Sequence, residues 1–124
     1  MTYKILIVDD NPDLVFTVKT GLERINEDIN VEGVNSGEEC FEFLREDNDT
    51  PDLILLDIMM PEMNGWDLFA KIKENPSWKE IPVVFLTAKT DSYSTGFGKI
   101  SAEDYIEKPF DIKDLDKRIK KILD

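Results

Sequence analysis

Four short apolar segments, each followed by polar or charged side chains, constrain the fold of this chain most strongly. The segments are residues 4–8, 53–56, 83–86 and 105–106, and the side chains that follow them are Asp9, Asp10, Asp57, Thr87 and Lys108. Helical patterns alternate with these segments, and strands that alternate with helices predict a mainly parallel sheet. We therefore expect an α/β fold whose strand ends carry acids, a hydroxyl group and a lysine.

Amphipathic patterns between the apolar segments predict the helices. Asn11 can cap a first helix that begins at Pro12, Ser36 and Glu39 form a capping box for a second, and Asp111 can cap the last. A third helix is expected after residues 64–65, and a weaker strand at residues 31–34. The side chains expected to face the core are Leu14, Val18, Leu22 and Ile25, then Cys40, Phe43 and Leu44, then Leu68, Phe69 and Ile72, and finally Ile112, Leu115, Ile119 and Ile122.

The composition excludes several classes of function. The 124 residues include 27 acidic and 15 basic side chains, a formal net charge of −12, which disfavours binding to nucleic acids or anionic membranes. Histidine is absent, which excludes a Ser-His-Asp triad, a Cys-His pair and histidine metal ligands. Cys40 is the only cysteine, so no internal disulfide can form, and its position in a helical pattern predicts a packed core residue.

The length and the hydropathy of the chain predict one domain, over residues 1–124. No stretch has the character of a signal peptide or of a transmembrane helix, so we expect a cytoplasmic protein. Because the last helical pattern runs to the end of the sequence, we expect no effector domain.

The polar groups at the strand ends predict a site for a metal ion and a phosphoryl group. The carboxyl ends of parallel strands meet at one edge of a sheet, so Asp9, Asp10 and Asp57 should lie close together and repel one another. An all-oxygen ligand set suits a hard cation such as Mg²⁺. Lys108 and Thr87 can bind phosphoryl oxygens, and an ionised aspartate such as Asp57 is a competent nucleophile toward phosphorus.

Each of these groups alone also has an ordinary structural interpretation. Asp9 or Asp10 could cap a helix, Thr87 could be a turn residue, and Lys108 before Pro109 could belong to an unremarkable loop. Their occurrence together, in order and on a predicted βα framework, favours the functional interpretation.

Four segments carry a resemblance to the receiver domains of two-component response regulators, and to the single-domain chemotaxis type in particular. They are residues 7–10 (IVDD), 56–65 (LDIMMPEMNG), 86–88 (LTA) and 104–110 (DYIEKPF). The resemblance covers essentially the whole chain. It implies a single (βα)5 flavodoxin-like domain with a five-stranded parallel sheet in the order 2-1-3-4-5.

The resemblance also implies roles for the acidic residues. Asp57 would accept a phosphoryl group from a phosphohistidine of a histidine kinase or of a phosphotransfer protein. Asp10, Asp57 and the backbone carbonyl of Met59 would bind Mg²⁺ directly, and Asp9 would act through a metal-bound water.

Further roles implied by the resemblance concern the response to phosphorylation. Lys108 would contact the phosphoryl group, before a cis peptide bond to Pro109. Thr87 would move toward the phosphate and Tyr105 would swing inward. Met59 and Lys89 stand at the positions that tune the lifetime of the phosphate. The switched surface would comprise the fourth helix, the fifth strand and the fifth helix.

One segment departs from the family pattern. Between Thr87 and Lys108 the chain is one residue shorter than usual, and Ser101 stands where glycine is usual. The stretch at residues 90–99 contains Gly96 and Gly98, each of which costs a helix about 1 kcal/mol relative to alanine. We therefore expect a short, irregular or mobile fourth helix, and the alternative is a normal helix held by tertiary packing.

Alternative functions are also open from the sequence. The first expectation is a phosphorylatable switch that is not an enzyme, and its runner-up within the family is a phosphate sink that only drains a kinase. A Mg²⁺-dependent aspartyl phosphohydrolase would require a second Asp at the position of Met59. A flavin-binding domain would require a Ser/Thr/Gly-rich phosphate loop where Asp9, Asp10 and Asn11 stand.

Overall fold

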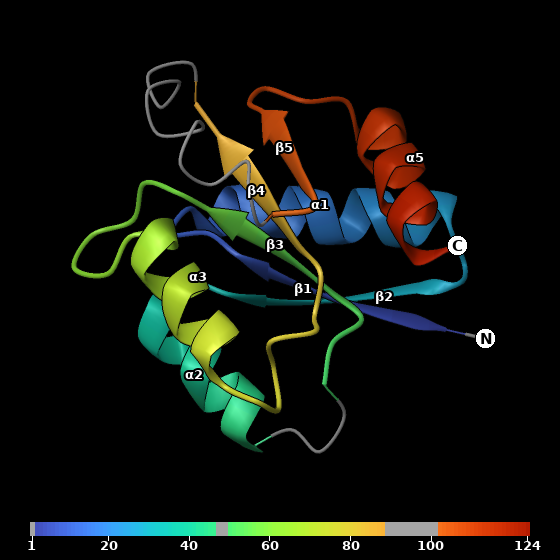
Figure 1. Cartoon of the computed structure of the whole chain (residues 1–124). Helices are drawn as coiled ribbons and strands as arrows, with labels where there is room; N and C mark the ends of the chain where they lie inside the picture. Colours follow the sequence, from blue (N-terminus) through green and yellow to red (C-terminus); the bar gives the residue numbers. More distant parts are fainter. Residues whose placement is uncertain (1, 47–49, 89–101) are drawn as a thin grey trace.

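A five-stranded parallel sheet forms the centre of the computed structural model, which describes residues 2–46, 50–88 and 102–124 (Figure 1). The strands lie in the order β2-β1-β3-β4-β5, which confirms the predicted flavodoxin-like topology. Their bounds are Tyr3–Val8 for β1, Ile29–Val34 for β2, Leu53–Asp57 for β3, Val83–Thr87 for β4 and Asp104–Glu107 for β5.

Four helices follow strands in the described part of the chain, and side-chain caps explain where they begin. The helices are α1 (Pro12–Ile25), α2 (Gly37–Glu46), α3 (Gly65–Glu74) and α5 (Ile112–Leu123). Side-chain oxygens of Asn11, Asn64 and Asp111 accept hydrogen bonds from first-turn amides of α1, α3 and α5. Such bonds satisfy donors that the helix itself leaves unpaired. The predicted fourth helix, and Lys89, fall outside the described residues.

The capping bond predicted for Ser36 is present, and the return bond of Glu39 goes to the residue before the cap. Ser36 Oγ accepts a hydrogen bond from the amide of Glu39 at 3.1 Å, and Glu39 Oε1 accepts one from the amide of Asn35 at 2.7 Å. The same arrangement places Cys40 in the core, as predicted, where burial raises the pKa of its thiol to about 12.

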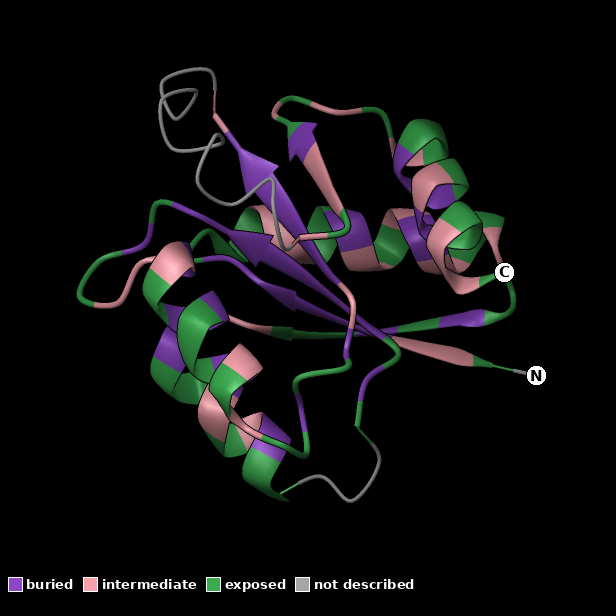
Figure 2. Cartoon of the chain, in the orientation of Figure 1, coloured by how far each residue is buried: buried purple, intermediate pink, exposed green. Residues whose placement is uncertain are grey.

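Two hydrophobic cores lie on opposite faces of the sheet. Along β3, Leu53 and Leu55 face the core covered by α1 and α5, while Ile54 and Leu56 face the core covered by α2 and α3. Figure 2 shows the buried strands between the two helical layers. Burial on both faces explains why β1, β3 and β4 are continuous apolar runs. The polar residues after these runs consequently lie at the edge of the sheet and not in either core.

The structure corrects two details predicted from the sequence and qualifies a third. Ile25 is 42% exposed, because it is the last residue of α1, where the chain turns away and neighbours cover fewer sides of a side chain. Phe43 packs against the core as predicted but is only partly buried, and Lys4 Nζ lies 5.4 Å from the centre of its ring. Strand β2 begins at Ile29, two residues before the predicted start, because Tyr3 of β1 pairs with it there.

Candidate functional site

Strand register brings the predicted site residues to one edge of the sheet. Val8 of β1 pairs with Leu56 of β3, so Asp9 and Asp57 follow side by side. Asp57 in turn pairs with Leu86 of β4, immediately before Thr87. Since Thr87 pairs with Glu107 of β5, Lys108 also comes directly after this edge. Residues from four strands thus converge at the carboxyl end of the sheet.

An acidic cluster lies at this edge. Asp9, Asp10 and Asp57 each offer a carboxylate oxygen, and these oxygens lie within 4.8 Å of one another. Asp9 and Asp57 are buried, whereas Asp10 is exposed. Buried carboxylates of like charge need a compensating cation, because burial and repulsion both disfavour the ionised form.

Lys108 supplies part of that compensation. Its Nζ donates hydrogen bonds to Asp9 Oδ2 at 2.9 Å and to Asp57 Oδ1 at 3.1 Å. Burial works against the charge of Lys108, but these hydrogen bonds and the two negative charges outweigh it, so the pKa of Lys108 is raised. The ammonium group therefore stays charged and ties the ends of β1 and β3 together.

The charge balance at Asp57 remains unfavourable for the ionised form. Burial, followed by the negative charge of Asp9, raises the pKa of Asp57 from 3.8 to about 6, although Lys108 opposes the shift. Asp57 is therefore mostly ionised at neutral pH, but its negative charge is held at a cost in free energy.

We predict that Asp57→Asn stabilises the protein above pH 6 in the absence of divalent cations. The unfolded chain releases the Asp57 proton near pH 3.8 and the folded chain near pH 6, so this group lowers stability as the pH rises between those values. The variant should exceed the wild type by up to about 3 kcal/mol above pH 6, with the difference vanishing below pH 4. Urea unfolding in chelator-containing buffers measures this. A wild type more stable than the variant at pH 7 would contradict it.

A second layer of hydrogen bonds positions Asp9. Asp9 Oδ1 accepts from the amide of Asn11 at 3.0 Å, and the carbonyl of Asp9 accepts from Asn35 Nδ2 at 2.9 Å. Asn35 follows β2 and thereby joins the fifth strand end to the site. Sequence reasoning missed this residue, although a polar amide directly after a strand was the available signal.

The loop between β3 and α3 follows Asp57 directly and is tightly turned. Met63 donates its amide to the carbonyl of Pro61 at 2.8 Å, and Glu62 between them has a φ of 67°. This i to i+2 bond with a positive φ at a non-glycine residue is a strained γ-turn. Met59, at the start of the loop, is 58% exposed.

The groups expected to respond to phosphorylation lie around β4 and β5. Thr87 is buried at the end of β4, and the predicted cis peptide bond between Lys108 and Pro109 is present. The ring of Tyr105 stacks on Phe85 with centroids 5.4 Å apart. Within the described part of the chain, the buried hydroxyl of Tyr105 has no hydrogen-bond partner, and burial raises its pKa. The inward movement of Tyr105 remains a prediction.

A family model described as the response regulator receiver domain matches residues 5–120. The chain belongs to this family. Response regulator ArlR of Staphylococcus saprophyticus is 39% identical over 123 residues, which cover 97% of this chain and 52% of that protein. Receiver domains are signalling domains of two-component systems, as the resemblance implied.

Solved receiver domains share the fold. The crystal structure of a receiver domain protein from Clostridium thermocellum has a TM-score of 0.86 at 26% identity, covering 98% of this chain and 94% of the other. A CheY-like receiver domain protein from Methanospirillum hungatei has a TM-score of 0.81 at 34% identity, covering 97% and 93%.

The curated response regulators that match this chain are longer than it is. This receiver chain spans about half the length of the curated response regulators it matches, at 52% and 50%. Within the described residues, no helix combines the length and the apolar character that crossing a bilayer requires.

Proposed function

We propose that this receiver domain is a phosphorylatable switch in which Asp57 accepts a phosphoryl group with the help of Mg²⁺. The observation that carries the proposal is the placement of Asp57. Its carboxylate ends a buried strand, lies within 4.8 Å of the ligand oxygens of Asp9 and Asp10, and accepts a hydrogen bond from Lys108. An ionised carboxylate beside acidic metal ligands and a fixed ammonium group is suited to phosphoryl transfer.

The residues present fit Mg²⁺. The cluster offers oxygen ligands only, and burial together with the negative charge of Asp9 raises the pKa of Asp57, so a bound cation would favour its ionised form. Asp10, Asp57 and the carbonyl of Met59 would hold the ion, with Asp9 acting through a water. When bound, Mg²⁺ would neutralise part of the charge on the carboxylates and on the phosphoryl oxygens.

The proposed phosphodonor is a phosphohistidine of a histidine kinase or a phosphotransfer protein. A carboxylate oxygen of Asp57 attacks phosphorus, an O–P bond forms, and the P–N bond breaks with its electron pair returning to the imidazole. Lys108, whose Nζ already lies 3.1 Å from Asp57 Oδ1, would then bind a phosphoryl oxygen, and the Thr87 hydroxyl would bind another.

Phosphorylation would then change a protein-binding surface on the fourth helix, β5 and α5 of a cytoplasmic protein. The downstream target is a protein and not a nucleic acid or a membrane, consistent with the net charge of −12. A phosphate sink remains the alternative within the family. Turnover as an aspartyl phosphohydrolase is disfavoured, because Met59 at the second position after Asp57 cannot donate or accept a proton.

A labelling experiment with acetyl phosphate tests the proposed chemistry. Intact-mass spectrometry should detect one added phosphoryl group in the presence of Mg²⁺ and almost none in the presence of EDTA. Equal labelling under both conditions would refute the role of the metal, and no labelling under either would refute the phosphoacceptor function.

We also predict that Mg²⁺ stabilises the fold. A ligand that binds only the folded state stabilises it by about 2.7 kcal/mol at 100 times its dissociation constant. Thermal melts at increasing Mg²⁺ should therefore show a rising midpoint for the wild type. Asp10→Ala should lose most of this response, whereas Asp13→Ala, at an exposed acid three residues further along the chain, should retain it. If the wild type does not respond to millimolar Mg²⁺, the metal site is wrongly assigned.

A further inference from the structure

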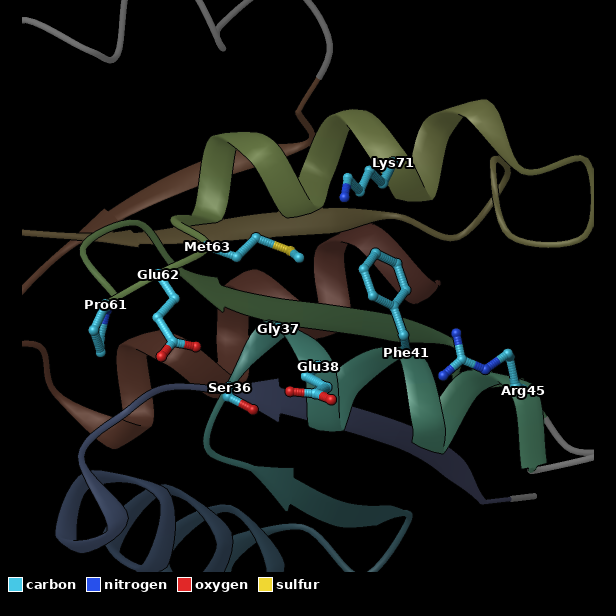
Figure 3. Close-up of a pocket in the computed structure, with 9 residues that line it drawn as sticks. All are labelled: Ser36, Gly37, Glu38, Phe41, Arg45, Pro61, Glu62, Met63 and Lys71. Atoms are coloured by element: carbon cyan, nitrogen blue, oxygen red, sulfur yellow. The ribbon is translucent and has the colours of Figure 1, made fainter.

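A groove lies beside the candidate site, between α2, α3 and the β3–α3 loop (Figure 3). Its volume is about 380 Å³, within the range of pockets that bind small molecules or peptide segments. Phe41 and Met63 form its apolar middle, and Pro61 lies at one end. Neither the acidic cluster nor Lys108 lines this groove, so it is a separate surface.

The residues that line the middle of the groove are packed against neighbouring side chains and backbone. The ring of Phe41 stacks on Trp78 with centroids 6.0 Å apart, and Lys71 Nζ lies 6.0 Å from the centre of the Phe41 ring. Met63 packs closely on Gly37, because a Cβ added to Gly37 would come within 2.8 Å of the Met63 sulfur. An apolar side chain that enters the groove therefore meets surfaces that are already packed in place.

The charges around the groove are separated by sign. Figure 3 shows Glu62 at the end near Pro61 and Arg45 at the opposite end, beyond Phe41, with Glu38 and Lys71 between them. Across residues 2–46, 50–88 and 102–124, none of these four side chains forms an ion pair. A ligand of one charge would be attracted at one end and repelled at the other, so the groove favours a bipolar ligand.

The spacing of the charges selects the length of that ligand. Glu38, Phe41 and Arg45 stand at positions i, i+3 and i+7 of α2, on one face of the helix. Seven residues of helix rise about 10 Å, which is also the length of about three residues of extended chain. A free amino acid is too short to reach both ends, whereas a short extended peptide is long enough.

We propose that this groove binds an extended segment of a partner protein, with a basic residue, an apolar middle and an acidic residue in that spacing. The basic residue would lie near Glu38 and Glu62, the apolar side chains on Phe41 and Met63, and the acidic residue near Arg45 and Lys71. This binding does not depend on phosphorylation of Asp57, so its test is independent of the proposed switch.

A titration monitored by NMR tests the proposal on the whole chain. The probe is a lysine–leucine–leucine–glutamate tetrapeptide capped at both ends, added to ¹⁵N-labelled protein. We expect saturable shifts for the amides of Phe41 and Met63 and for the indole N–H of Trp78. Tetrapeptides with lysine at both ends or glutamate at both ends should bind about fivefold more weakly, as expected for the loss of an exposed ion pair.

Charge-reversal variants provide the matched comparison. Arg45→Glu and Glu38→Lys should each weaken binding of the probe about fivefold. Lys117→Glu, at an exposed position of α5, changes the net charge as Arg45→Glu does and should leave binding unchanged. Circular dichroism melts confirm that each variant is folded.

Three outcomes would overturn the proposal. The first is equal weakening by Lys117→Glu and Arg45→Glu, which would mean nonspecific attraction. The second is binding of the peptide with two lysines that is as tight as binding of the lysine–leucine–leucine–glutamate probe. The third is a concentration-dependent shift of the same amides without peptide, accompanied by dimers in sedimentation, which would mean that a second copy fills the groove.

Discussion

Asp57→Asn should abolish phosphorylation of this receiver domain by acetyl phosphate or by a phosphorylated kinase. The substitution preserves the shape of the side chain and its ability to accept a hydrogen bond from Lys108, which lies 3.1 Å from Asp57 Oδ1. It removes the anionic oxygen that attacks phosphorus, and an amide oxygen is far less nucleophilic. Intact-mass spectrometry and peptide mapping should find label on Asp57 in the wild type and none in the variant.

The control is an aspartate at the other end of the same strand. Asp52 is exposed, and its Oδ2 accepts a hydrogen bond from the amide of Lys4. Asp52→Asn therefore makes the same chemical change away from the acidic cluster and should be labelled like the wild type. Equal labelling of Asp57→Asn and the wild type, or a labelled peptide that lacks residue 57, would show that another residue is the acceptor.

Gly65→Ala should cause a large loss of stability. Gly65 is the first residue of α3, and its amide donates a hydrogen bond to the carbonyl of Ile58 at 2.8 Å. A Cβ at this position would overlap the carbonyl oxygen of Asp57 and come within 2.8 Å of the Ile58 Cα. Because these are backbone atoms at the end of a buried strand, they cannot move aside without distorting the site. We expect a loss of about 3 kcal/mol or more in urea unfolding.

The matched control is the glycine at the first position of α2. A Cβ at Gly37 would also be tightly placed, at 2.8 Å, but its neighbour is the sulfur of Met63, the flexible part of an unbranched side chain. Gly37→Ala should therefore stay within about 1 kcal/mol of the wild type, because less freedom in the unfolded chain offsets the local adjustment. Equal losses for the two variants would show that the backbone contact at Gly65 is not the cause.

The helices and strands could be predicted from the sequence because the patterns that define them are local. Alternating apolar runs and amphipathic helices define the elements, and the caps at Asn11, Ser36 and Asp111 fix where three helices begin. Local patterns define the ends of elements less well. Ile25 continued the apolar spacing of α1 and is nevertheless 42% exposed. The spacing of apolar residues does not reveal where neighbouring segments stop packing against a helix.

The residue types that form the candidate site could be predicted from the sequence. Asp9, Asp10, Asp57, Thr87 and Lys108 all follow apolar runs, and parallel strands bring their carboxyl ends together. Asn35 was missed because its contribution is a bond to the backbone of a residue 26 positions away. A polar amide directly after a strand marked the position, but that signal does not specify how the two loops meet, on which the role of Asn35 depends.

The residue types at the strand ends define the chemistry available to this protein: three carboxylates, a hydroxyl group and a lysine, with no histidine. How that chemistry is tuned depends on contacts between residues that are far apart in the sequence. Lys108 reaches Asp57 across 51 positions of sequence and Asp9 across 99, and burial beside Asp9 raises the pKa of Asp57 to about 6. The physical reason is that residue type is a local property, whereas electrostatic interaction and close contact depend on distances and burial that exist only after distant segments pack together.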